Sequence, residues 1–305
     1  MLRSCNNTMD LNKIGDLPYT IKLCDHTEQM DKAQDQTYTG VAVDELTGES
    51  FIYGMITDGH GSNECIEFLR SFSRKRMAEI IGKRNPVETL AEYIISKTKK
   101  GGATMCLTKV YKDRIECINC GDSRLAVYKD GELVFLSQEH NWTNSQERQR
   151  LIGSDNFMGF TPSSGIQVTN ETDMIGCYME YATWKDHSKL ACTQSLGSNG
   201  KTGYAPDHTV IPIEPLSTYK IIIGSDGLWD MMIKNKGTDL GVDNTDLLRL
   251  YTMSARNIVD MAVSRWLQEW NMGILHEGTI SFEKGQYKRY HCDDVSSVVI
   301  DILPL

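Results

Sequence analysis

Two Asp-Gly pairs follow apolar runs in this sequence and could supply ligands for a metal ion. Apolar residues lead into Asp58-Gly59 and, far downstream, into Asp226-Gly227. Such a run is typical of a buried strand, and glycine after the carboxylate lets a backbone or an ion approach closely. Residues that favour a helix then follow each pair, rather than a returning strand. We therefore expect two strand ends that share one metal site.

Four further carboxylates stand near strand-like segments or near the N-terminus. Asp293 and Asp294 directly precede an apolar, β-branched run, Asp122 lies between two strand-like segments, and Asp35 lies near the N-terminus. Carboxylates that converge without cations repel one another and raise one another's pKa values. Mg²⁺ and Mn²⁺ prefer oxygen ligands and retain several waters. The pattern therefore favours a site for these two ions.

An isolated Asp-Gly is more often an ordinary turn, and this sequence contains one. Asp130-Gly131 separates the strand-like segments 125–128 and 133–136, which predicts a hairpin. Asp58 and Asp226 differ because no strand-like segment returns after them.

The order of these motifs resembles the metal-dependent protein phosphatases, the PPM or type 2C family, over about residues 30–303. The fold that this resemblance implies is α+β, a four-layer α-β-β-α sandwich of two mainly antiparallel sheets flanked by helices. It also implies one phosphatase domain over residues 1–305, with a variable flap at about residues 155–210. The motifs that carry the resemblance are Asp35, Asp58-Gly59-His60-Gly61, Gly121-Asp122-Ser123-Arg124, Ser225-Asp226-Gly227-Leu228-Trp229-Asp230 and Asp293-Asp294-Val295-Ser296.

The resemblance implies a protein serine/threonine phosphatase in which a hydroxide bridging two Mg²⁺ or Mn²⁺ ions attacks phosphoserine or phosphothreonine. The implied catalytic residues are Asp58 and Asp226, which hold the ions, and His60, which protonates the departing alkoxide. Asp293 is a further ligand, and the carbonyl of Gly59 is a backbone ligand.

Two other aspartates have weaker implied roles in the same site. Asp122 matches the ligand of a possible third ion, which would bind less tightly. Asp35 would act mainly through water bound to the metal.

The chain departs from the family where phosphate is bound. The family commonly has an arginine at the position of Met30, and Lys32 could replace it as a weaker phosphate contact, because an ammonium lacks the bidentate fork. Two alternatives to a protein phosphatase follow. One is a catalytically weak pseudophosphatase that binds phosphoproteins, and the other is a metallohydrolase of small phosphate esters.

Composition narrows the possible partners. The 305 residues carry a formal net charge of −9 without a basic cluster interleaved with aromatics, so we expect a phosphorylated protein substrate and no nucleic acid. No apolar run approaches the ~20 residues that cross a bilayer, and no secretion signal begins the sequence, so we expect a soluble, intracellular monomer, cytoplasmic or nuclear.

The nine cysteines fit reduced thiols, and Cys117 and Cys120 should point to opposite faces of a strand.

Periodicity predicts the elements that position these residues. Asn85-Pro86-Val87-Glu88 is a capping-box start for a helix, and a second helical stripe runs from Val259 to Trp270. Short turns between strands favour antiparallel sheets. The predicted strands are 105–110, 114–119, 124–128, 133–136, 219–224 and 295–302.

Overall fold

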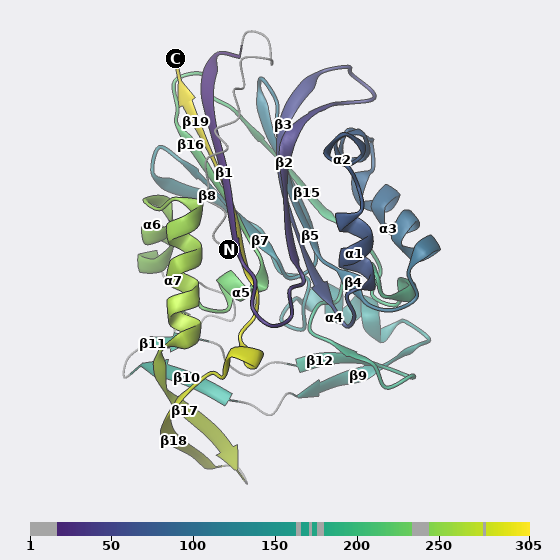
Figure 1. Ribbon diagram of the computed structural model, residues 1–305, viewed down its shortest axis with the longest axis vertical. Coiled ribbons are helices and arrows are strands. Elements are labelled where there is room, and N and C mark those ends of the chain that lie inside the picture. Colours follow the sequence, from purple (N-terminus) through teal and green to yellow (C-terminus); the bar gives the residue numbers. More distant parts are fainter. Residues whose placement is uncertain (1–16, 163–165, 171–172, 176–179, 234–243, 277–278) are drawn as a thin grey trace.

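Two antiparallel sheets pack face to face in the computed structural model, which describes residues 17–162, 166–170, 173–175, 180–233, 244–276 and 279–305 (Figure 1). The smaller sheet has five strands, and every pairing within it is antiparallel. Its strands, in spatial order, are β1 (Tyr19–Glu28), β19 (Val295–Pro304), β16 (Tyr219–Gly224), β7 (Arg124–Lys129) and β8 (Glu132–Leu136).

The larger sheet has seven strands and carries the first Asp-Gly motif on its longest strand. Strand β2 (Asp35–Val43) pairs with β3 (Ser50–His60), on a branch off the main order. The main order is β14 (Leu196–Gly197), β4 (Gly102–Ala103), β3, β5 (Met105–Val110), β6 (Arg114–Cys120) and β15 (Asp207–Pro212).

Apolar side chains from both sheets fill the space between them. Ile52 and Ile56 of β3 pack in one buried cluster with Ile221, Ile223 and Ile300 of the smaller sheet. Because side chains alternate along a strand, the other face of each sheet needs a separate cover.

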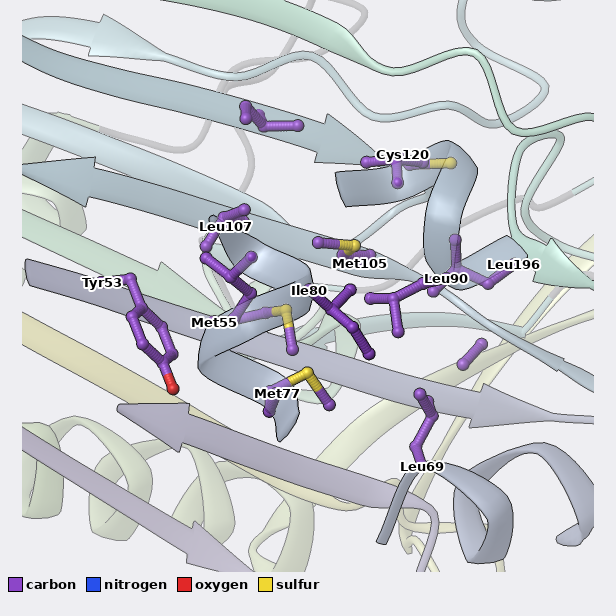
Figure 2. Packing of buried hydrophobic residues seen from close by; sticks show 14 of the residues in the cluster. Tyr53, Met55, Leu69, Met77, Ile80, Leu90, Met105, Leu107, Cys120 and Leu196 are labelled. Atoms are coloured by element: carbon purple, nitrogen blue, oxygen red, sulfur yellow. The ribbon is translucent and has the colours of Figure 1, made fainter. Parts of the chain in front are cut away.

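Helices provide that cover on both outer faces. Helices α1 (Glu64–Arg70), α2 (Arg74–Ile81) and α3 (Pro86–Lys97) lie against the larger sheet, where their apolar residues meet those of β3 and β5 (Figure 2). Helices α5 (Asp226–Trp229), α6 (Asn244–Tyr251) and α7 (Ala255–Leu267) cover the smaller sheet. The predicted four-layer α-β-β-α sandwich is therefore confirmed (Figure 1).

The local predictions agree closely with the observed elements. The six predicted strands correspond to β5, β6, β7, β8, β16 and β19, with ends that differ by at most two residues. The hairpin between β7 and β8 turns at Asp130 and Gly131, whose φ values of 51° and 91° are those of the left-handed region. Helix α3 begins at Pro86 as expected, but Asn85 does not cap it, since its side-chain amide donates to Glu88 instead (2.9 Å).

The helical stripe predicted up to Trp270 was wrong at its end. Helix α7 stops at Leu267, and Trp270 belongs to strand β17 (Glu269–His276), although its side chain is still buried. Strand β17 pairs with β18 (Thr279–Gln286) and β10 (Ile166–Asn170), and β10 pairs with β11 (Asp173–Ile175). Tryptophan favours either element when it is buried, so periodicity alone could not locate the boundary.

Residues 155–210, expected to form a variable flap, contribute strands to three sheets, one of which is the sheet of β10 and β11 with β17 and β18. Strands β9 (Phe157–Pro162), β12 (Glu180–Trp184) and β13 (Lys189–Leu190) form a small sheet against α4 (Ser145–Ile152). Strand β14 and the first residues of β15 instead belong to the larger sheet, with a 3₁₀ turn, η1 (Ser198–Gly200), after β14. A second 3₁₀ turn, η2 (Arg289–His291), precedes β19.

Two remaining sequence predictions can be compared with the structure. Cys117 faces the space between the sheets and Cys120 faces the helices, as expected, and burial raises the pKa of both thiols, that of Cys117 to about 12. Neither thiol is therefore activated as a nucleophile. None of the helices in the described residues combines the length and apolar character needed to span a bilayer.

Candidate active site

Asp35 and Asp58 lie directly opposite each other on the paired strands β2 and β3. Both are almost completely buried. The pKa of Asp35 is raised to about 7, mainly by burial. Hydrogen bonds from Ser296 and Ser225 oppose this rise, whereas the charges of Asp294 and Asp293 add to it. A β-ladder thus holds two acidic side chains together in a place where water is scarce.

Asp226 enters the same cluster from the end of β16, as the first residue of α5. The following Gly227 leaves no room for a side chain, since a Cβ there would lie 2.1 Å from the carbonyl oxygen of Asp294. This close backbone contact holds the end of β16 beside the residues that precede β19. Burial and the charge of Asp293 raise the pKa of Asp226 to about 7.

The carboxylates of Asp35, Asp58 and Asp226 act on one another electrostatically. Burial raises the pKa of Asp58 well above its usual value, and Asp226, Asp35 and Asp293 raise it further. The side chains of Asp58 and Asp226 share a hydrogen bond, and Oδ1 of Asp226 has no partner among the described residues.

This donor set fits hard divalent cations, because it consists of buried carboxylate oxygens that only a cation or a proton can neutralise. No three acidic, histidine or cysteine side chains in the described part of the chain form a ready-made metal-ligand group.

Lys32 lies at this cluster, with its ammonium 2.8 Å from Oδ2 of Asp293. Burial alone would lower its pKa, but Asp293 more than offsets this effect and the pKa is raised. Asp226 and Asp58 also act on Lys32 electrostatically. The residue predicted to contact phosphate is thus placed beside the predicted metal ligands, with its side chain 43% exposed.

Met30 does not face the cluster. Its side chain is buried among apolar residues under α5 and α7, including Trp229 and Cys292. An arginine at position 30 with this backbone would have to place its guanidinium in that core.

Asp294 is a structural contributor to the site that the sequence reasoning did not identify. Its two carboxylate oxygens accept the backbone N–H groups of Met30 and Gln34, the latter at 2.5 Å. The carbonyl of Gln34 in turn accepts the N–H of Gly59 at 3.0 Å. Asp294 thereby fixes the loop before β2 against the first Asp-Gly motif. The sequence showed the acidic pair at positions 293–294, but it did not show that Asp293 pairs with Lys32 while Asp294 accepts backbone N–H groups.

Gly59 and His60 complete the end of β3. A Cβ on Gly59 would lie 2.3 Å from Cγ1 of Ile66, so the position requires glycine. Burial lowers the pKa of His60 to about 4, and neither ring nitrogen has a hydrogen-bond partner among the described residues. The imidazole is therefore neutral near pH 7 and has both nitrogens available.

Asp122 lies in the turn between β6 and β7. Burial raises its pKa well above the usual value, and the charges of Asp226 and Glu139 add to this effect. The preceding Gly121 has a φ of +131° and donates its N–H to Nδ1 of His140 (3.0 Å). The charge of Asp226 thus acts on Asp122.

Comparisons with solved structures identify the fold class. A serine-threonine phosphatase 2C from Toxoplasma gondii aligns with 94% of this chain and 96% of its own, with a TM-score of 0.56 and 11% identity. A serine/threonine phosphatase of S. agalactiae aligns with 92% of this chain and 99% of its own, with a TM-score of 0.51 and 15% identity. At these identities the likeness concerns the fold alone.

The chain belongs to the protein phosphatase 2C family, whose sequence model matches residues 57–268. Two curated Arabidopsis thaliana relatives, probable protein phosphatases 2C 11 and 2C 2, are 23% and 24% identical over 77% and 73% of this chain. The chain spans about 60% of the length of these relatives.

Proposed function

We propose that this protein is a metal-dependent protein serine/threonine phosphatase. One observation carries the proposal: Asp35 is paired with Asp58 across β2 and β3, and the charges of Asp226 and Asp293 act on the buried Asp58 at the end of β3. Without cations, so many buried carboxylates destabilise the fold. Membership of the protein phosphatase 2C family supports phosphoester hydrolysis as the reaction.

The ions proposed are two Mg²⁺ or Mn²⁺, with Asp122 available for a weaker third. When bound, such ions polarise the phosphoryl group and lower the pKa of coordinated water. Asp58, Asp226 and Asp293 would supply carboxylate oxygens, Gly59 its carbonyl, and Asp35 a contact through water.

The residues around the cluster would act on the substrate. His60 follows the proposed metal-binding Asp-Gly directly, and its two ring nitrogens have no partners among the described residues. Bound phosphate would favour the imidazolium over the neutral form present near pH 7, and the imidazolium would give a proton to the departing serine or threonine oxygen. Lys32 would contact a phosphate oxygen as a point charge. Its bond to Asp293 would have to loosen for that contact.

The substrate proposed is a phosphorylated protein, bound by a monomer. The test is hydrolysis of a phosphothreonine peptide and of an aryl phosphate, each with Mn²⁺, with Mg²⁺ and with chelator. Peptide hydrolysis that needs either ion supports the proposal. Hydrolysis of the aryl phosphate alone would favour an enzyme for small phosphate esters, and no hydrolysis of either substrate would favour a phosphoprotein-binding module.

A further inference from the structure

A cavity of about 540 Å³ lies between the first turn of α3, the outer face of strands β5 and β6, and the segment 203–208. A volume of this size is typical of sites for small organic molecules. Its floor includes Lys109, Glu116 and Ile118, which share the face of the sheet that the helices cover. None of the predicted active-site residues lines it.

Lys109 is the unusual residue in this cavity. It is only 3% exposed, and no described residue accepts a hydrogen bond from its ammonium or forms an ion pair with it. Its ammonium lies 5.0 Å from the ring centroid of Phe51. Burial lowers the pKa of Lys109, and the charges of Glu116, Asp44 and Glu45 partly oppose this effect. The side chain of Lys109 is thus buried at the cavity wall without a hydrogen-bond acceptor for its ammonium in the described residues, and an anion in the cavity would supply one.

The first turn of α3 adds further donors to the same cavity. This 12-residue helix has no side-chain cap, because the amide of Asn85 donates to Glu88 and does not accept from the backbone. Its first residue, Pro86, has no N–H, so the N–H groups of Val87 and Glu88 remain uncapped by side chains. Helix N-termini favour negative charge.

The other charged residues that line the cavity do not remove its preference for an anion. Glu116 is bound by Arg114 (3.0 Å) and His208 (3.5 Å), while Glu88 is bound by Asn85. The guanidinium of Arg84 at the rim forms no hydrogen bond or ion pair with any described residue. The two carboxylates thus have partners, whereas neither Lys109 nor Arg84 has a side-chain hydrogen-bond acceptor or an ion-pair partner in the described part of the chain.

We propose that this cavity binds a small organic anion, with a carboxylate or phosphate-type group on Lys109 and a short apolar body against Val87, Ile118 and Pro206. The apolar part follows from those side chains, and the charged part follows from Lys109 and the uncapped first turn.

The cavity is separate from the phosphoester site. The opposite end of α3 leads to Gly101 and Gly102, and a Cβ on Gly102 would lie 2.7 Å from Cε1 of His60. A helix of 12 residues is about 18 Å long, so its first turn lies far from the acidic cluster. An anion in the cavity would leave that cluster free.

The test is methyl NMR of the metal-loaded full chain with isoleucine labelling, with Ile118→Val to assign the Ile118 signal. Benzoate and phenylphosphonate are the anionic probes, and benzamide is the neutral probe of similar shape. We expect the Ile118 methyl to shift with at least one anion and to respond at least about tenfold more weakly to benzamide, as loss of one charge-assisted bond implies. The anion that shifts it distinguishes a carboxylate from a phosphate-type group.

Ile66, which packs against Gly59, reports any binding at the acidic cluster instead. Lys109→Met should weaken the binding at Ile118 by about tenfold, while the matched change Lys112→Met, on the exposed turn after β5, should not. The proposal is overturned if neither anion shifts Ile118, or if benzamide binds as well as the anions. Unchanged anion binding in a folded Lys109→Met protein would overturn it too.

Discussion

Asp35 of β2 and Asp58 of β3 are directly paired residues, so the backbone ladder brings two buried carboxyl groups to one point. Strand pairing fixes the backbone positions of both residues, so both side chains leave the same face of the sheet side by side. Repulsion between the two carboxylates therefore destabilises the folded state, and protonation or metal binding reduces this effect.

The first prediction is that the metal-free protein loses stability between about pH 6.5 and pH 8. The folded-state pKa values of Asp35 and Asp226 are raised from 3.8 to about 7, so the stability they contribute is complete below about pH 4 and is lost as the pH rises through 7. The pKa of His60 is lowered from 6.5 to about 4, so its contribution is complete above 6.5 and is lost only below that pH. Between pH 6.5 and 8 the carboxylates therefore dominate.

Thermal unfolding in chelator at pH 6.5 and pH 8 measures this effect. The Tm should be lower at pH 8, Mn²⁺ should remove the difference, and Asp35→Asn should reduce it. A metal-free Tm that is equal or higher at pH 8 would contradict the prediction.

The second prediction concerns His60. His60→Ala should slow phosphothreonine hydrolysis by about 10² to 10⁴, the usual range for general acid catalysis, and should slow an aryl phosphate much less. An acid matters most when the departing oxygen is basic. Steady-state kcat values on the two substrates decide the matter, and equal losses would indicate that the histidine has a structural role.

The third prediction concerns Lys32. Lys32→Ala should raise KM for a phosphopeptide by about tenfold and leave kcat largely unchanged, because a uniformly binding charge is lost. The matched control is Lys83→Ala, which removes a lysine of similar exposure from an ion pair of the same length with Glu45, outside the site. A silent Lys32→Ala would mean that phosphate is held without this lysine.

The fourth prediction concerns Asp294 as a positioning residue. Asp294→Ala leaves two N–H groups without their acceptors and should cost about 2–4 kcal/mol of unfolding free energy. It should also weaken Mn²⁺ binding, because the loop before β2 contacts Gly59. Asp294→Asn, which keeps one acceptor oxygen, should be intermediate.

Urea unfolding and a Mn²⁺ titration test this role. Asp301→Ala is the control, since Asp301 lies on β19, the strand that follows Asp294, and forms an ion pair with Lys220 (3.2 Å). It should cost less than about 1 kcal/mol, as partly exposed pairs usually do. An Asp294→Ala protein that matches this control in both measurements would exclude the positioning role.

Local patterns in the sequence were sufficient to predict the strand that carries Asp58 and the strand that ends just before Asp226, whereas the sandwich was predicted from the family resemblance. An apolar run that ends at Asp-Gly specifies a strand end at one point in the chain, and Asp130-Gly131 specifies a hairpin. The need for glycine after Asp58 and Asp226 was also visible in the sequence, although the contact of Gly227 with the Asp294 carbonyl was not.

The remaining features depend on contacts between distant segments. Nothing local distinguishes Asp293, which pairs with Lys32, from Asp294, which accepts backbone N–H groups 260 or more residues away. The burial of Met30 likewise depends on α5 and α7, which come about 200 residues later. The roles of these side chains depend on packing between segments that are distant in the sequence, which a local sequence pattern does not reveal.

The central claim is that the acidic cluster binds divalent metal, and calorimetric titration of chelator-treated protein with Mn²⁺ tests it most directly. The account predicts two bound ions for the unaltered chain, and for Asp226→Asn a loss of affinity of more than about 100-fold at one of them or both, since even residues outside the ligand set cost 10–100-fold. The absence of bound Mn²⁺, or unchanged binding in Asp226→Asn, would contradict it.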